Sequence, residues 1–310
     1  MAIAINDPRR RGIRPFAISA RELRQHRTAF LFLLPTLLIY ATFMVYPFFG
    51  SIQLSLTNWN GVDAVKEWVG LDNYVAALTA DPVMQQALWH NVIWIVAVIT
   101  IPLVLGLLVA TILWDGAKGQ TLFRTAFFMP YVLPSVAIGI IFGLIYNPIF
   151  GALNGFLRAI GLDALAGGWL AEPNRALPSL IAVEVWASFG FNATVLLAAL
   201  QNIDQDVLDA AKIDGANVWQ RFVNVLLPQL GHVITLLVSL ALIGGFKVFD
   251  LVYIMTGGGP GYHTEVVATH IFQQSFARNL VGYGTALSLI LTAIILVASI
   301  LFIQFRERRA

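Results

Sequence analysis

One stretch of the chain, residues 82–114, reads PVMQQALWHNVIWIVAVITIPLVLGLLVATILW and contains no Asp, Glu, Lys or Arg. A bilayer core of about 30 Å is crossed by roughly 20 apolar residues in an α-helix. The stretch is long enough to cross, and we place the predicted transmembrane helix at 91–113. The whole chain agrees with this interpretation, because 58% of its 310 residues are hydrophobic and only 12% are charged.

Five further segments have the same apolar character. The transmembrane helices predicted from them are 29–49, 125–147, 179–201, 233–255 and 284–305. Backbone polar groups in lipid must be satisfied within the chain, so runs of this length predict helices and not a barrel. The predicted fold is therefore an all-α integral membrane protein with six transmembrane helices. A basic segment at 1–28 precedes the first helix, a loop at 50–90 follows it, and residues 91–310 hold the other five helices, with a long loop at 202–232.

The distribution of Lys and Arg predicts the orientation of this bundle. Fourteen of these residues lie in the N-terminal segment, the C-terminus, and the loops after the second and fourth predicted helices. The opposite loops hold four, and Lys247 lies within a predicted span. Both termini and the 202–232 loop are therefore predicted to be cytoplasmic. The basic start resembles a signal peptide, but its apolar run is too long and lacks a small-residue cleavage site, so we interpret it as an uncleaved first helix. The fourteen are Arg9, Arg10, Arg11, Arg14, Arg21, Arg24, Arg27, Lys118, Arg124, Lys212, Arg221, Arg306, Arg308 and Arg309, and the four are Lys66, Arg158, Arg175 and Arg278.

Several classes of chemistry are not indicated by this sequence. It has no cysteine, its five histidines show no metal-ligand spacing, and no Ser/His/Asp arrangement stands out. A formal charge of +2 is too small to indicate nucleic-acid binding. The glycine-rich run at 257–260 lacks the Gly-Lys-Ser/Thr ending of a nucleotide-binding loop. We therefore predict no catalytic residue, no metal site and no bound nucleotide.

The 202–232 loop contains DAAKIDGANVWQRFVNVLLPQL, residues 209–230, which is more polar than its surroundings. Asp204 and Asp206 suit a helix start, and Gly215 interrupts the apolar periodicity that follows. The pattern predicts two short amphipathic helices with a bend at Gly215. Their apolar faces need a cover, and the residues alone leave three covers open: membrane lipid, the helix bundle itself, or a partner protein.

The same loop resembles the cytoplasmic signature of ABC importer permeases. That signature is Glu-Ala-Ala, three residues, Gly, nine residues and Ile-x-Leu-Pro, and here it runs Asp209-Ala210-Ala211, Gly215 and Val225-Leu226-Leu227-Pro228 at the same spacing. Asp209 replaces Glu and Val225 replaces Ile. The resemblance implies a coupling helix that sits in a cleft of an ATP-hydrolysing subunit. The residues it implicates are Asp209, Ala210, Ala211, Asp214, Gly215, Ala216, Trp219, Phe222, Leu227 and Pro228.

A wider resemblance narrows the family. The matching segments are Trp59-Asn60, 69–74, 127–130, Phe249-Asp250 and 256–260, and they are similar to the carbohydrate-uptake permeases related to the maltose transporter, in particular to the larger of two paired permeases. The resemblance implies a type I importer fold in a bacterial or archaeal cytoplasmic membrane. It also implies a second homologous permease, an ABC ATPase dimer that binds ATP and Mg, and an extracytoplasmic sugar-binding protein. The chain itself is expected to bind no cofactor.

The outer run of glycines has two interpretations. Gly257, Gly258, Gly259 and Pro260 allow a tight turn, and on the predicted outer face they also form a candidate contact for the binding protein. The transported solute is expected to be a mono- or oligosaccharide, or a related polyol or glycerol phosphate ester, moved by alternating access.

Charged residues inside predicted spans are costly and usually functional. Glu184, Lys247 and Asp250 lie at compatible depths, with Lys247 predicted one turn deeper than Asp250 on the same helix face. They form either an ion-paired staple between two helices or, together with Trp186, Asn192 and Tyr253, part of a substrate cavity. The alternative functions are an ion- or proton-coupled secondary transporter, with the three charges as relays, and a membrane scaffold that transports nothing.

Overall fold

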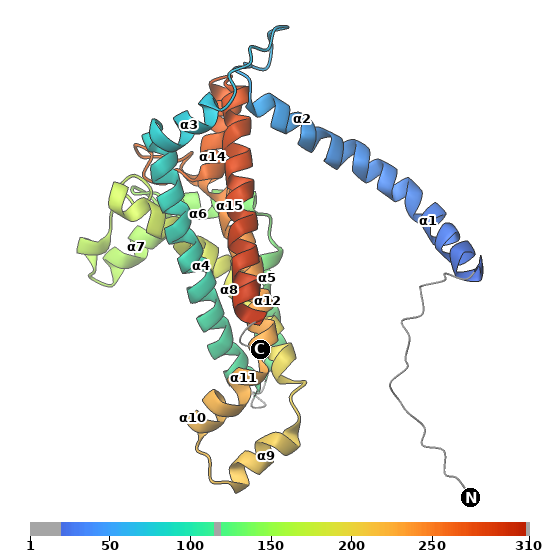
Figure 1. Ribbon diagram of the computed structural model, residues 1–310. Coiled ribbons are helices and arrows are strands. Elements are labelled where there is room, and N and C mark those ends of the chain that lie inside the picture. The colour runs from blue at the N-terminus through green and yellow to red at the C-terminus, as the bar shows by residue number, and fades with distance from the viewer. Residues whose placement is uncertain (1–19, 115–118, 308–310) are drawn as a thin grey trace, which may run out of the picture. The chain divides into compact units, whose positions relative to one another are not determined.

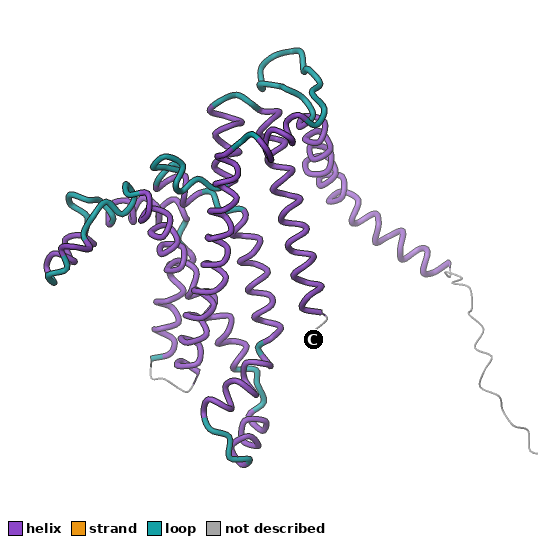
Figure 2. Tube along the Cα trace, turned by 60° about the vertical axis from the view of Figure 1, so that its left-hand side comes forward, coloured by secondary structure: helices purple, strands orange, loops and turns teal. Residues whose placement is uncertain are grey.

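The computed structural model describes residues 20–114 and 119–307, with side chains over 30–114 and 119–306. Within these ranges the chain is helical, and in place of strands it has one isolated antiparallel bridge between Thr57 and Trp68. Figure 2 shows the succession of helices and loops. Of the basic residues used to predict orientation, Arg9, Arg10, Arg11, Arg14, Lys118, Arg308 and Arg309 lie outside the described residues.

The chain divides into two compact units, Met1–Gln53 and Leu54–Ala310. The first contains α1 (Ala20–Tyr40), the π-helical turn η1 (Ala41–Val45) and most of α2 (Tyr46–Ser55). Its helix is continuous over Phe30–Ser55 with a mean hydropathy of 1.8, which is sufficient to cross a membrane.

The second unit is a helical bundle (Figure 1). Its elements are α3 (Asp72–Thr79), α4 (Pro82–Trp114), α5 (Gln120–Val132), α6 (Ser135–Ile145), α7 (Ala152–Ala159), η2 (Asp163–Leu165), α8 (Pro173–Leu200), α9 (Gln205–Ile213), α10 (Val218–Arg221), η3 (Phe222–Leu226), α11 (Leu227–Gln229), α12 (Gly231–Phe246), α13 (Asp250–Met255), α14 (Val267–Phe272), η4 (Gln273–Ala277) and α15 (Val281–Glu307).

Four helices in the described residues are long and apolar enough to cross a membrane by themselves. They are Phe30–Ser55, Pro82–Trp114, Pro173–Leu200 and Val281–Arg306. Two bent pairs pass the same test together: α5 with α6, at 97°, and the Val218–Gln229 segment with α12, at 65°. The described residues therefore contain four to six candidate spans, and the prediction of an all-α membrane protein is confirmed at that level.

Two of the segments that we predicted as single spans are broken in the structure. The 125–147 segment is divided between α5 and α6, which meet at Leu133 and Pro134 in extended conformation. Proline lacks an N–H donor and disfavours helical geometry in the residue before it, which explains the break. The 233–255 segment is also divided, because α12 ends at Phe246 and α13 begins at Asp250. Lys247 and Asp250 consequently do not share one helix face.

The core of the second unit is built on the long helices. α4 packs along α8, and α5 crosses α8 where Gly190 lies. A Cβ atom on Gly190 would overlap the carbonyl oxygen of Phe127, so only glycine allows this approach of the two backbones. Small residues at such crossings are characteristic of helix packing in membranes, where close contact replaces the hydrophobic effect as the driving force.

Polar contacts define the two ends of this bundle. At one end Tyr283, in the first turn of α15, donates to the Asp81 carboxylate at 2.6 Å, next to the start of α4. At the other end Arg306 donates from Nε to Thr235 Oγ1 and from Nη2 to the Gly231 carbonyl, both at 2.7 Å. α9 and α10 lie at the Arg306 end, and α3, α7 and α14 lie toward the Asp81 end (Figure 1). The last described turn of α15 is thus on the same side as the 202–232 loop.

Candidate functional site

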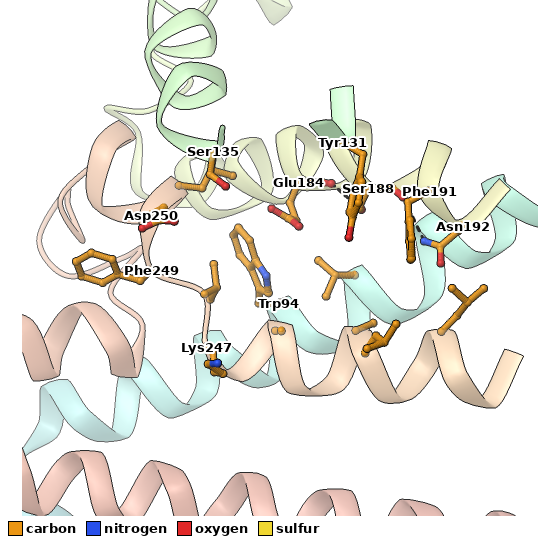
Figure 3. A pocket seen from close by; sticks show the side chains of 18 residues that line it. Trp94, Tyr131, Ser135, Glu184, Ser188, Phe191, Asn192, Lys247, Phe249 and Asp250 are labelled. Carbon is orange, nitrogen blue, oxygen red and sulfur yellow. Dashed lines mark hydrogen bonds between the residues drawn. The ribbon is translucent and has the colours of Figure 1, made fainter. Parts of the chain in front are cut away.

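A cavity of about 400 Å³ lies between α4, α8, α12 and the two helix breaks (Figure 3). Its walls mix apolar side chains with acidic, basic, amide, hydroxyl and aromatic groups. The polar and aromatic lining residues are Trp94, Tyr131, Ser135, Glu184, Ser188, Phe191, Asn192, Lys247, Phe249 and Asp250.

One wall comes from a single face of α8. Glu184, Ser188, Phe191 and Asn192 recur at helical spacing, which places their side chains on one side of the helix. The Ser188 hydroxyl donates to the Glu184 carbonyl at 2.7 Å, and the Phe191 ring stacks on Tyr131 with centroids 4.5 Å apart. The Glu184 carboxylate accepts no hydrogen bond from the described protein groups around it and is directed into the cavity (Figure 3).

The opposite wall comes from the break between α12 and α13. Asn91 on α4 donates from Nδ2 to the carbonyl of Gly245 at 3.1 Å and accepts at Oδ1 from the Val267 amide at 2.9 Å. Asn91 is fully buried, so both bonds are shielded from solvent. They satisfy backbone groups near the end of α12 and the start of α14, and thereby hold the break that presents Lys247 and Asp250.

Four of the six residues predicted to form the intramembrane cluster line this cavity. They are Glu184, Asn192, Lys247 and Asp250. Glu184 and Lys247 lie on opposite walls (Figure 3), and no ion pair joins Glu184, Lys247 and Asp250 among the described side chains. The ion-paired staple that we considered is therefore not present in this arrangement.

The other two predicted residues lie elsewhere. Trp186 packs on Phe142, with ring centroids 5.1 Å apart. Tyr253 stacks on Phe249 at 5.1 Å and also contacts Phe272 at 5.0 Å. Both therefore belong to aromatic clusters beside the cavity and are not among the residues that line it.

As lining residues, sequence reasoning missed Trp94, Tyr131, Ser135, Ser188, Phe191 and Phe249. Ser188 and Phe191 could have been found, because they follow Glu184 at four and seven residues on one helix. Trp94 had no such signal. It lies in the middle of an apolar run and is almost wholly buried, at 1% exposure.

The 202–232 loop forms the two helices that the sequence predicted, with the bend at Gly215, where φ is +77°. Asp204 caps α9 by accepting from the Asp206 amide at 3.0 Å. Asn217 and Gln220 cap α10 reciprocally, through bonds of 2.8 and 2.9 Å. The loop is thus ordered by its own hydrogen bonds.

The loop buries one side and exposes the other. Leu208 and Leu226 are buried in a core cluster with α4 and α8, whereas Ile213, Val218 and Trp219 are exposed by 87%, 73% and 70%. Of the residues that resemble the signature, Asp209, Ala210, Asp214, Gly215, Trp219 and Pro228 are exposed, and Ala211, Ala216, Phe222 and Leu227 are partly buried. Asp209 pairs with Lys212 at 2.7 Å on the surface.

The Gly257–Pro260 run forms a tight turn closed by Thr264. Thr264 donates from Oγ1 to the Gly259 carbonyl at 2.6 Å and from its amide to the Gly258 carbonyl at 3.2 Å. Glu265 lies buried beneath the turn, where Gln273 donates to its Oε2 at 3.2 Å and Oε1 finds no partner among the described residues. Burial raises the pKa of Glu265 to about 7.

Apolar spans, broken helices and a cavity lined by polar groups between the helices are typical of a membrane transport protein. Residues 102–309 match the family described as binding-protein-dependent transport system inner membrane component. The match covers more than half of the chain, so the protein belongs to this family. It is a permease component of a binding-protein-dependent ABC transport system.

Curated relatives are similar to this chain along nearly its whole length. The probable ABC transporter permease YurN of Bacillus subtilis strain 168 is 37% identical over 89% of this chain and 94% of its own length. MsmF of Streptococcus mutans, a permease of a multiple sugar-binding transport system, is 31% identical over 94% and 99%. AmyD of Thermoanaerobacterium thermosulfurigenes, a probable permease for starch degradation products, is 30% identical over 90% and 94%.

A solved structure shares the fold. A chain of a bacterial alginate ABC transporter, in complex with a periplasmic protein that carries an alginate pentasaccharide, is 20% identical. The alignment has a TM-score of 0.82 and covers 93% of this chain and 96% of that one. At this identity the likeness shows the fold alone.

Proposed function

We propose that the protein is one of two paired permeases of an ATP-driven importer for a carbohydrate, either a mono- or oligosaccharide or a related polyol or glycerol phosphate ester. The observation that carries the proposal is the cavity of about 400 Å³ in the bundle, in which Glu184, Asn192, Lys247 and Asp250 meet Trp94 and Tyr131. Relatives named for multiple-sugar and starch-product transport support the substrate class.

The lining of this cavity suits a hydroxyl-rich solute. Carboxylates accept hydrogen bonds, the ammonium group donates them, and an amide does both. The aromatic rings offer flat apolar surfaces to the C–H faces of a sugar ring. Few sites inside a membrane protein combine these groups, because each charge is costly there without a polar partner.

Two of the cavity residues also support the proposal that a second permease binds this chain. Lys247 and Asp250 are exposed in the single chain and have no ion-pair partner among the described side chains. Charges in lipid need either an aqueous cavity or a neighbouring protein. We infer that a homologous second permease completes the cavity on this side, so that solute passes between the two chains.

The orientation follows from the proposed partners. We infer six spans in the bacterial or archaeal cytoplasmic membrane, with both termini in the cytoplasm. The 202–232 loop then faces an ABC ATPase dimer, which binds ATP and Mg. Exposed apolar side chains at Ile213, Val218 and Trp219 support docking there, because exposed apolar surface commonly marks a contact with a partner protein or a membrane. The turn at Gly257–Pro260 then faces the extracytoplasmic sugar-binding protein.

The chain would work by alternating access. Closure of the ATPase dimer moves the 202–232 loop, and Leu208 and Leu226 transmit that movement because they pack into the core that α4 and α8 share. The breaks between α5 and α6 and between α12 and α13 line the cavity, which is where irregular backbone is tolerated in a membrane protein. ATP hydrolysis belongs to the partner, so this chain is a transporter subunit and not an enzyme.

Neutralising the cavity charges tests this proposal. We expect Asp250→Asn and Lys247→Gln to lower sugar uptake by cells at least about tenfold, while the importer complex is recovered from membranes in normal yield. Asp163→Asn, which changes an exposed carboxyl group in η2, is the matched control and should transport normally. Normal uptake by both cavity variants would contradict the cavity assignment. Loss of the assembled complex in both would assign these residues to structure.

A further inference from the structure

A second cavity, of about 350 Å³, lies between the 202–232 loop and the end of α4, and the exposed Val218 is among the residues that line it. Its lining comes from the last turn of α4 and from α9, α10 and η3. The residues that decide its chemistry are Thr111, Trp114, Leu208, Lys212, Arg221 and Phe222.

The charged lining of this cavity is basic, and Gln205 and Thr111 add neutral polar groups. Arg221 is partly buried, and its Nε atom has no hydrogen-bond partner among the described residues. Lys212 lines the same cavity and keeps free donors, since its exposed pair with Asp209 uses only one bond. No acidic side chain is among the described residues that line the space. An orphaned guanidinium donor beside an ammonium group is suited to an anion, and a guanidinium matches phosphate geometry especially well.

Most of the remaining lining is apolar, and part of it lies at the end of the α4 span. Trp114 is the last residue of the α4 span, and Thr111 is one turn inside it. Tryptophan is enriched at the level of lipid headgroups. Leu208, Phe222 and Leu226 form the floor, where they pack with the helical core. A ligand that combines an anionic group with an apolar tail matches this division.

We propose that this cavity binds the headgroup of an anionic phospholipid, with the phosphate on Arg221 and Lys212 and the glycerol and upper acyl chain against Trp114 and Phe222. The cytoplasmic leaflet holds anionic lipids, and basic pockets between helices on that side bind their headgroups. This step rests on the orientation in the proposed function. A bound lipid bridges α4 to α9 and α10, and so it braces the loop against the helix bundle.

Native mass spectrometry of the purified full-length chain in mild detergent tests the proposal directly. The probes are dioleoylphosphatidylglycerol, dioleoylphosphatidylcholine with the same acyl chains, and inorganic phosphate. We expect wild type to retain one more phosphatidylglycerol molecule than Arg221→Gln, whose affinity for it falls about tenfold. Phosphatidylcholine should not distinguish the two proteins, and Arg221→Lys should bind at an intermediate level because it keeps the charge without the planar fork.

Arg158→Gln is the matched control, because Arg158 is an exposed arginine at the other end of the bundle. It should bind phosphatidylglycerol as wild type does. Equal phosphatidylglycerol binding by wild type and Arg221→Gln would overturn the proposal. Full displacement of the lipid by inorganic phosphate would also overturn it, in favour of a free-anion site. Neither readout requires the ATPase or a sugar, so failure here is distinct from failure of the proposed function.

Discussion

Asn91, buried in the first third of α4, donates a hydrogen bond of 3.1 Å to the backbone carbonyl of Gly245, next to the last residue of α12. The same side chain accepts a bond of 2.9 Å from the Val267 amide at the start of α14. One amide thus connects three helices at the level where α12 stops and Lys247 enters the cavity. The position of the cavity charges depends on this connection.

Replacing Asn91 with Leu should disrupt both the fold and the cavity. The substitution leaves the Gly245 carbonyl and the Val267 amide buried without a partner, which costs roughly 2–5 kcal/mol in the free energy of unfolding. Asn91→Asp keeps the acceptor for Val267, but its carboxyl group can donate to the Gly245 carbonyl only when it is protonated. The destabilisation by Asn91→Asp should therefore be smaller at low pH. Thermal unfolding in detergent measures both. Asn202→Ala removes an exposed, local bond and serves as the control. Equal stability of Asn91→Leu and the control would show that the connection is unimportant.

Gly190 should not tolerate even a methyl group. Its Cβ would overlap the Phe127 backbone, so Gly190→Ala must push α5 away from α8 and should cost about 1–3 kcal/mol or more. Gly244→Ala is a matched control, because a Cβ at that position of α12 would have no atom within 4 Å apart from its chain neighbours and its own helix backbone. We expect a lower midpoint of thermal unfolding for Gly190→Ala only. A similar loss in both variants would attribute the effect to glycine in membrane helices generally.

Glu265 makes stability fall as the pH rises. Burial raises its pKa from 4.5 to about 7, so the folded protein holds the proton more tightly than the unfolded chain does. The resulting stabilisation is complete below about pH 4.5 and is lost progressively up to about pH 7, by at most about 3 kcal/mol. Glu265→Gln cannot ionise and should flatten this part of the profile. Thermal unfolding between pH 5 and 8 tests it, with exposed Glu67→Gln as the control. An unchanged slope in Glu265→Gln would refute the assignment.

Asp81 should have the opposite dependence on pH. Burial acts to raise the pKa of its carboxyl group, but hydrogen bonds from Tyr283, His270 and the Met84 amide outweigh burial, and the net pKa is lowered. The stabilisation is therefore present at neutral pH and is lost as the pH falls through the acidic range. Asp81→Asn should destabilise the protein by about 1–3 kcal/mol at pH 7. The difference from wild type should shrink on acidification. A difference that stays constant down to acid unfolding would contradict this.

Hydropathy predicted the positions of the membrane helices more accurately than it predicted the points where those helices break. The span expected at 91–113 lies within α4, and the span expected at 284–305 lies within α15. The span expected at 179–201 extends one residue beyond the end of α8. The helix breaks at Pro134 and at Lys247 were not predicted, because the mean hydropathy of a segment carries no information on the direction of its backbone. Pro134 was visible in the sequence, but the break before Asp250 depends on Asn91, which is more than 150 residues away and leaves no local pattern.

The sequence likewise predicted some of the residues of the candidate site but not their arrangement. Charge in a predicted span identified Glu184, Lys247 and Asp250, because such residues are rare in lipid. The absence of an ion pair among them was not predictable, since their predicted positions assumed one continuous helix from 233 to 255, whereas α12 ends at Phe246 and α13 begins at Asp250. Trp94 and Tyr131 are apolar enough to pass as ordinary core residues, and only the packing of α4 and α5 against α8 brings them to the cavity.

Recovery of partner subunits tests the central claim most directly. Tagged wild-type protein, gently extracted from its native membrane, should bring along an ABC ATPase and a second permease, identified by mass spectrometry. Gly215→Pro should lose the ATPase, because proline holds φ near −65° whereas Gly215 needs +77° to orient α9 and α10. Gly161→Pro makes the same change at φ +79° in an exposed turn beside α7, and it should keep the ATPase. Recovery of the wild-type chain alone, without any ATPase, would contradict the account.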